Sequence, residues 1–325
     1  MSKKFWWAIS IFVVIIVSLG IFGFTKSFKP VVSQKTIKIA HFRETSALPF
    51  YIANEKGYFK AENLNVELVE VDSKQLIDTL VTGKVDFTSA IAWPSVVGFE
   101  IEHPEILKPF GIMGESNSGD TIDGFLVKED SKINKLEDFK GKTIAFDNPR
   151  GIPSAKMVFK KIGFDPDKDV VLMDMGKDII ASALLSGKVD AVWTTQPSLT
   201  IIANKIKTKI VEPNMRTRYL TDPYWISPMG LTTNNFILQN REIVNKVENA
   251  LKESLAFIQN NPVETRIIAT KYTPLTSDIT EKMGVQTYKS TPDNQDYLSM
   301  QSIVDSLVEA QILKKGTGLI PMYAK

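Results

Sequence analysis

The stretch LLSGKVDAVW, residues 184–193, has an earlier partner in LVTGKVDFTS, residues 80–89. The two stretches share Leu, Gly, Lys, Val and Asp in register, and Gly83 and Gly187 lie 104 residues apart. Each glycine follows a run with the apolar spacing of a helix and precedes a short apolar run. Each stretch therefore predicts a helix, a left-handed glycine that ends it, and a strand. Two copies in one chain predict a repeated unit.

The sequence on either side of these stretches repeats at nearly the same offset. Strand-like residues 36–42 match residues 142–148, and the helical runs that follow them reach Gly57 and Gly163. Strand, helix, strand, helix, strand is thus written twice, which predicts parallel sheets with right-handed crossovers. Units of this kind also look alike without a duplication, so the homology of the two halves stays open, but the predicted α/β architecture does not depend on it.

Composition restricts the chemistry that the chain can perform. It has 325 residues, 43% hydrophobic and 23% charged, which suits two ordinary globular domains, and its net charge of +2 indicates no nucleic-acid partner. It has no cysteine and two histidines. Disulfides, thiol nucleophiles and a lipoprotein attachment site are therefore excluded. We expect no metal site, no cofactor and no catalytic residue.

The N-terminal segment has the composition of a membrane span. Residues 5–24 carry no charge, and 20 helical residues cover the roughly 30 Å of a bilayer core. We expect an uncleaved anchor in the cell membrane, a tether over residues 25–35, and an extracytoplasmic remainder. A cleaved signal peptide, which would leave a secreted or periplasmic protein, is the alternative.

Polar residues follow the predicted strands of the first half. Thr45 and Ser46 lie where the first strand passes into a helix, and Ser89 ends the third strand shortly before Trp93. Ligands of open parallel sheets bind at such strand ends. All four are candidate ligand-binding residues. The alternatives are that Ser46 only caps its helix and that Trp93 belongs to the core.

The second half offers a similar set. Arg150, in the turn after its first strand, can bind a carboxylate, sulfonate or phosphate through a bidentate contact, unless it is a solvated loop residue. The remaining candidates are polar or aromatic residues near predicted strand ends: Asn148, Thr194, Thr195, Gln196 and Trp225.

Three segments, in order, resemble a known family. Residues 48–71 are similar to the opening lobe of ABC-transporter substrate-binding proteins of the nitrate, sulfonate and taurine type. Residues 133–146 look like the family's entry to the second lobe, with Phe139 in place of the usual Leu. Residues 184–199 resemble its Gly-x-Val-Asp-Ala segment, although Gln196 stands where many relatives have glutamate. The likeness covers roughly residues 36–325.

The resemblance implies a type 2 periplasmic binding protein fold: two α/β lobes joined by two hinge strands and preceded here by the N-terminal transmembrane helix. We expect lobe 1 to comprise residues 36–128 and 228–325, and lobe 2 residues 129–227. The predicted hinge strands lie within residues 124–130 and 227–237. Helices are predicted over the C-terminal ranges 241–261, 277–288 and 293–313.

The resemblance also implies a function. It indicates the extracytoplasmic solute-binding component of an ABC importer, a monomer and not an enzyme, which holds a sulfonate, nitrate, taurine-like or related organic anion between its lobes. Its partners would be a permease and an ATPase. Two alternatives remain: an enzyme on the same fold, of the pyrimidine-precursor or menaquinone-pathway type, and a membrane-tethered ligand sensor.

Overall fold

The computed structural model describes residues 35–89, 91, 93–110, 113–116, 121–147, 151–220, 225–228, 230–284, 287–290, 292–309, 311 and 313. Internal contacts divide the chain into two units, Met1–Lys35 and Thr36–Lys325. The predicted membrane segment, residues 5–24, lies outside the described residues. Among the helices that are described, none is both long and apolar enough to span a bilayer.

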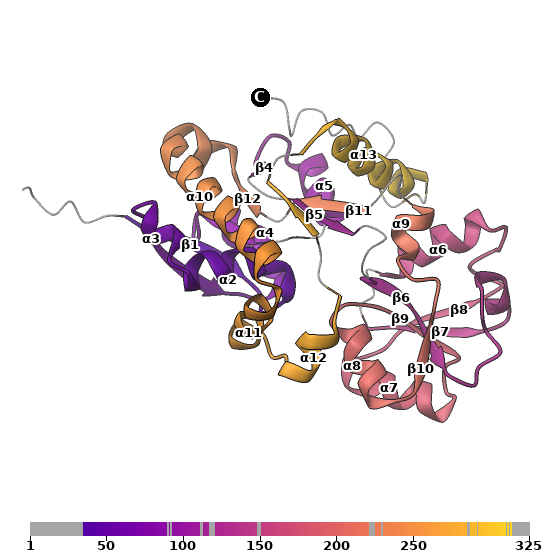
Figure 1. Ribbon diagram of the computed structural model, residues 1–325. Helices are drawn as coiled ribbons and strands as arrows, with labels where there is room; N and C mark the ends of the chain where they lie inside the picture. The colour runs from indigo at the N-terminus through magenta and orange to yellow at the C-terminus, as the bar shows by residue number, and fades with distance from the viewer. Residues whose placement is uncertain are drawn as a thin grey trace, which may run out of the picture. The chain divides into compact units, whose positions relative to one another are not determined.

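The second unit, Thr36–Lys325, contains three sheets (Figure 1). In spatial order, the first consists of β2 (Asn65–Glu70), β1 (Thr36–His41), β3 (Phe87–Ser89), β12 (Gly230–Thr233) and β4 (Leu107–Pro109). The second consists of β10 (Thr208–Val211), β6 (Asp123–Lys128), β9 (Ala191–Thr195), β7 (Thr143–Phe146) and β8 (Val171–Asp174). The third, smaller sheet consists of β11 (Trp225–Pro228), β5 (Met113–Ser116) and β13 (Thr287–Lys289).

The predicted repeat is confirmed by the sheet topology. In the first sheet β1 pairs in parallel with β2 and β3, and in the second β7 pairs in parallel with β8 and β9. Gly83 and Gly187 have φ values of 70° and 76°, the left-handed conformation expected where a helix ends. Each half is therefore strand, helix, strand, helix, strand, with the first strand at the centre.

The aspartate shared by the two opening stretches has the same role in both halves. Asp86 accepts a hydrogen bond from the backbone N–H of Lys38 at 2.9 Å, and Asp190 accepts one from the backbone N–H of Thr143, also at 2.9 Å. Each aspartate thereby fixes the start of the third strand of its half to the first. The repeated sequence is accordingly a structural element of the sheet, which accounts for its recurrence without any contact to a ligand.

Helices cover both faces of the first and second sheets. On the second sheet, α6 (Gly151–Lys161) and α9 (Met215–Tyr219) bury one face, while α7 (Lys177–Ser186) and α8 (Ser198–Lys205) bury the other. One face of the first sheet packs against α2 (Leu48–Glu55), α3 (Tyr58–Ala61) and α10 (Asn234–Asn260). Its other face packs against α4 (Leu76–Val81), α5 (Trp93–Glu102) and α13 (Asn294–Glu309). The remaining elements are α11 (Pro262–Tyr272), α12 (Ser277–Lys282) and the short 3-10 turns η1 (Thr45–Ala47), η2 (Ser73–Gln75) and η3 (Leu136–Phe139).

The passage between the two large sheets differs from the prediction. Residues 124–128, expected in a hinge strand that closes lobe 1, belong to β6, which is hydrogen-bonded to β9 and β10 of the second sheet. The chain instead passes from β4 to β6 through β5 and returns from α9 to β12 through β11, and β5 and β11 pair antiparallel. A short apolar run has the same pattern in a crossing strand and in a buried sheet strand, so sequence could not separate the two.

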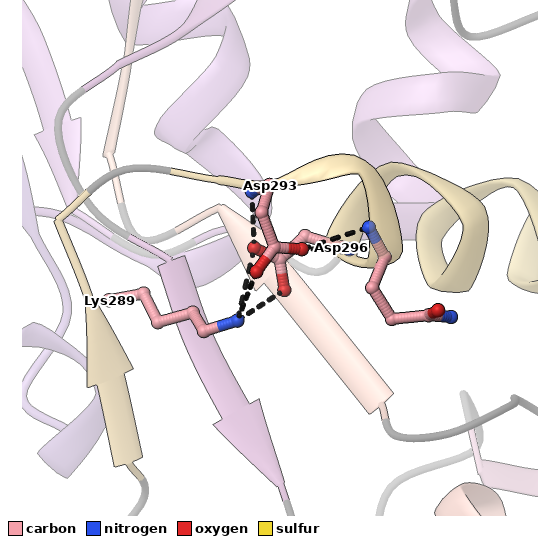
Figure 2. A network of polar contacts seen from close by, with 4 residues as sticks. Lys289, Asp293 and Asp296 are labelled. Carbon is pink, nitrogen blue, oxygen red and sulfur yellow. Dashed lines mark hydrogen bonds and ion pairs between the residues drawn. The ribbon is translucent and has the colours of Figure 1, made fainter.

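The C-terminal helices also differ in one respect. The helix predicted over residues 277–288 ends at Lys282, and residues 287–289 form β13, which pairs with β5. Figure 2 shows how β13 is joined to α13: Lys289 Nζ lies 3.0 Å from Asp296 Oδ1 and 3.1 Å from Asp293 Oδ2. Asp293 accepts hydrogen bonds from the first turn of α13, while Asp296 accepts one from the backbone N–H of Asp293 at 2.7 Å, a reciprocal cap.

Candidate functional site

The carboxyl ends of β1 and β3 bring three hydroxyl groups to one edge of the first sheet. Ser46 lies in η1 directly after β1, and Thr88 and Ser89 end β3. Thr88 and Ser89 are fully buried, and in the described part of the chain the hydroxyl oxygens of all three residues are buried without a hydrogen-bond partner. Buried hydroxyls are nearly always hydrogen-bonded in folded proteins. A group of three without partners at a strand end indicates a place for a polar ligand.

His41, the last residue of β1, and Tyr51 form a hydrogen-bonded aromatic pair next to this strand end. The Tyr51 hydroxyl donates to the carbonyl of Phe42 at 3.0 Å and lies 3.0 Å from His41 Nδ1. Because the hydroxyl has only one proton to donate, it accepts from His41, which places the imidazole proton on Nδ1. Burial lowers the pKa of His41. The ring is therefore neutral at pH 7 and serves as a fixed hydrogen-bonding group in the sheet edge.

Thr45 occupies the same edge in a different way. Its carbonyl accepts a hydrogen bond from the Tyr288 hydroxyl at 3.4 Å, so its backbone is tied to β13 of the small sheet. Glu44, its neighbour, lies 4.0 Å from Lys177 at the start of α7. That ion pair brings the segment after β1 close to the segment after β8, so the carboxyl ends of these two strands lie near each other.

The candidates at the end of β9 are engaged within the protein. The Gln196 side chain donates to the carbonyl of Thr121 at 3.1 Å and accepts from the Thr200 hydroxyl at 2.9 Å. It therefore joins β9 to the segment that leads into β6. Thr194 is fully buried and Thr195 is half-buried. Gln196 positions this strand end, and both the nitrogen and the oxygen of its side-chain amide already have protein partners.

A second polar cluster lies at the same end of the second sheet. Asp123, the first residue of β6, is fully buried and pairs with Thr195 across the ladder. Arg216 of α9 donates from Nε to Asp123 Oδ2 at 2.9 Å, and its guanidinium lies 5.5 Å from the centre of the Trp193 ring. Trp193 packs in turn against Phe146 at the end of β7. Asp123 and Arg216 could not be recognised from the sequence, because their pairing joins residues 93 positions apart.

The remaining predicted site residues are Trp93, Asn148, Arg150 and Trp225. Trp93, the first residue of α5, is fully buried in the hydrophobic core, which favours its packing alternative over ligand contact. Asn148 and Arg150 lie outside the described residues. The backbone of Trp225 pairs with Ser116 in the small sheet, while its side chain is not described.

The two large sheets, the antiparallel pair β5 and β11 between them and the facing strand ends define an α/β two-lobed periplasmic binding protein fold. The chain belongs to the NMT1/THI5-like family, whose family model matches residues 44–265. The resemblance seen in the sequence is thereby confirmed.

Three relatives document the relationship. A Bacillus subtilis (strain 168) protein whose name assigns it aliphatic sulfonate binding is 30% identical over 175 residues, which are 52% of this chain and 51% of that protein. The 4-amino-5-hydroxymethyl-2-methylpyrimidine phosphate synthase of Candida albicans (strain WO-1) is 30% identical over 151 residues, 44% of this chain and 40% of that enzyme. The chain thus spans about half the length, or less, of these curated relatives. The crystal structure of the periplasmic aliphatic sulphonate binding protein SsuA from Escherichia coli superposes with a TM-score of 0.71 at 16% identity, covering 88% of this chain and 96% of that one.

Proposed function

We propose that this protein is the extracytoplasmic solute-binding component of an ABC importer and that it holds a small sulfonate or related organic anion between its two lobes. Two lobes joined by a pair of strands suit capture by hinge closure. The closed form would be presented to a permease and its ATPase by a monomeric receptor that the N-terminal segment attaches to the membrane. The name of the Bacillus subtilis relative supports the choice of a sulfonate.

The observation that carries the proposal is the group of buried hydroxyls without partners, Ser46, Thr88 and Ser89. A hydroxyl donates one hydrogen bond, and hydroxyl donors at a strand end match the acceptor oxygens of a sulfonate or carboxylate. Leaving them unpaired is unfavourable, since a buried polar group without a partner costs about 1 to 3 kcal/mol. A ligand that accepts these hydrogen bonds recovers that cost in the bound state.

The test is Ser89→Ala in the full-length chain, purified in detergent and titrated calorimetrically with short alkanesulfonates. Removing an unpaired hydroxyl should leave stability unchanged or slightly raised, but should weaken binding by about 1 kcal/mol, roughly fivefold. The matched control is Ser254→Ala. Ser254 is also fully buried, but its hydroxyl donates to the carbonyl of Pro49 at 2.6 Å.

The control should show the opposite pattern. Ser254→Ala removes a satisfied hydrogen bond between α10 and α2, so it should lower stability by about 1 kcal/mol and leave affinity unchanged. The proposal is refuted if Ser89→Ala lowers stability as Ser254→Ala does while affinity for every sulfonate tested stays that of the wild type.

An enzyme is the second candidate, because a relative of equal identity is a pyrimidine phosphate synthase. In the described residues the strand ends present hydroxyls, an amide and an Asp–Arg pair, which suit binding, and His41 is held neutral by the sheet edge. Incubation of the purified chain with a bound candidate ligand, followed by denaturation and mass spectrometry, separates the two. Recovery of unchanged ligand supports a receptor, and a new product supports the enzyme.

A further inference from the structure

Asp123 Oδ1 and Trp193 Nε1 are among the buried polar atoms of the second lobe that lack hydrogen-bond partners within the described residues. Asp123 is fully buried and Trp193 is 3% exposed. One atom is an acceptor and the other is a donor. An unpaired buried acceptor on a carboxylate is the costlier of the two, because charged groups lose the strongest solvation on burial.

The two residues are neighbours on one face of the sheet. Asp123 lies opposite Thr195, and two positions further along the same ladder Phe125 lies opposite Trp193. Side chains two residues apart along a strand point to the same face. Arg216 lies against both residues, through its Nε bond of 2.9 Å to Asp123 and its 5.5 Å distance to the Trp193 ring. Asp123, Trp193 and Arg216 together form the Asp123 subsite.

The tryptophan ring is held rigidly at this position. A Cβ added at Gly151, the first residue of α6, would lie 2.5 Å from Trp193 Cε3. The ring is thus packed directly against the backbone at the start of α6, and it cannot turn to bring Nε1 to another acceptor without leaving this contact. Trp193 lies two residues before the carboxyl end of β9, the end at which ligands of parallel sheets bind.

The charge at the subsite is already balanced. Arg216 neutralises Asp123 through Oδ2, so the ligand need not be cationic to approach Oδ1. An acceptor-only anion, in contrast, would meet a carboxylate oxygen that it cannot satisfy. A hydroxyl satisfies both unpaired atoms, since it donates to a carboxylate and accepts from an indole N–H.

We infer that the Asp123 subsite recognises a hydrogen-bond donor and acceptor, such as a hydroxyl, at the end of the ligand opposite its anionic head. The anionic head is bound by Ser46, Thr88 and Ser89, so the inference rests on the proposed function and narrows it to substituted sulfonates. Asp123 Oδ1 and Trp193 Nε1 are ligand contacts, and Arg216 is a positioning residue that holds the Asp123 side chain in place through its bond to Oδ2.

The test compares two probes that differ by one hydroxyl, ethanesulfonate and 2-hydroxyethanesulfonate, by calorimetric titration of the full-length chain in detergent. The wild type should bind the hydroxylated probe roughly tenfold more tightly, the effect of one hydrogen bond to a charged group. Asp123→Asn, which keeps an oxygen for Arg216, should reduce that ratio to within about twofold while ethanesulfonate binding persists. Trp193→Phe keeps an aromatic ring, removes the N–H and should also reduce the ratio.

The outcomes separate this inference from the proposed function. Equal binding of the two probes by the wild type overturns the subsite and leaves the receptor in place. An equal loss for both probes in Asp123→Asn also overturns it, because Asp123 would then act only by holding Arg216. Failure of both probes to bind the wild type overturns the sulfonate cargo itself, and the subsite with it.

Discussion

Replacement of Gly151 by alanine tests the packing at the second strand end most directly. The added Cβ would lie 2.5 Å from Trp193 Cε3 and 3.0 Å from Phe146 Cδ1, and would overlap Trp193 Cζ3 still more. The optimal separation of non-bonded carbon atoms is about 3.5 to 4.0 Å, so the contacts with Trp193 are severe overlaps. Phe146 is fully buried and Trp193 nearly so, so neither ring can move aside into solvent.

The expected loss follows from that geometry. Overpacking a well-packed core costs about 1 to 3 kcal/mol, and the double contact with two fixed rings places Gly151→Ala near 3 kcal/mol. The helix-forming preference of alanine offsets at most about 1 kcal/mol of this. The matched control is Gly98→Ala in α5, where an added Cβ meets no atom within 4 Å. That substitution should stabilise the protein by about 0.4 to 1 kcal/mol.

Urea unfolding of the two variants beside the wild type measures both effects, and the same titration with sulfonates reports on the strand end. Gly151→Ala should unfold at lower urea and bind less tightly, whereas Gly98→Ala should unfold at equal or higher urea with unchanged affinity. Trp193→Leu introduced with Gly151→Ala should recover part of the loss, because the atoms that clash are then absent. If Gly151→Ala proves as stable as Gly98→Ala, the ring does not pack against α6 as described.

Two further predictions concern pH and the join between β13 and α13. Burial holds the pKa of His41 in the folded protein below its ordinary 6.5. At pH values between the folded pKa and 6.5 the unfolded chain therefore binds more protons than the folded chain. The stability of the fold falls as the pH drops through 6.5 toward the folded pKa. Thermal unfolding between pH 7 and 5.5 should show this decline, and His41→Asn, which keeps a donor for Tyr51 but does not titrate, should weaken it; an unchanged pH profile would contradict the role given to burial. Asp296→Ala should lower the free energy of unfolding in urea by about 2 kcal/mol. This loss is smaller than that for breaking a fully buried ion pair, because the Lys289 side chain is 31% exposed and retains its ion pair with Asp293 (Figure 2). Asp305→Ala, on the exposed side of the same helix, should stay within about 0.5 kcal/mol, and equal losses in the two variants would show that the buried network adds nothing.

Much of the fold could be predicted because its signals are local. The two units of strand and helix, the glycines that end α4 and α7 and the C-terminal helices α10 and α13 all follow from spacing within about 20 residues. The passage between the lobes could not be predicted in the same way. Whether residues 124–128 cross between sheets or join one depends on β9 and β10, which are more than 60 residues away.

For the candidate site as well, local signals could be predicted from the sequence and contacts between distant residues could not. Polar residues after a strand mark a candidate edge, so Ser46 and Ser89 were among the sequence predictions. The sequence could not show that Gln196 is occupied by Thr121 and Thr200, that Trp93 lies in the core, or that Arg216 reaches Asp123. Those assignments depend on which distant groups meet.

The sequence by itself determined the repeated α/β units, because helix periodicity, strand periodicity and left-handed glycines are demands of the local backbone. It also determined the family, through three short segments in order. Only the tertiary structure decided which polar atoms have partners. A hydrogen bond is made or missing according to positions fixed by the packing of the whole lobe, and three unpaired hydroxyls on one sheet edge and an unpaired carboxylate oxygen on the other are visible only once both sheets are assembled.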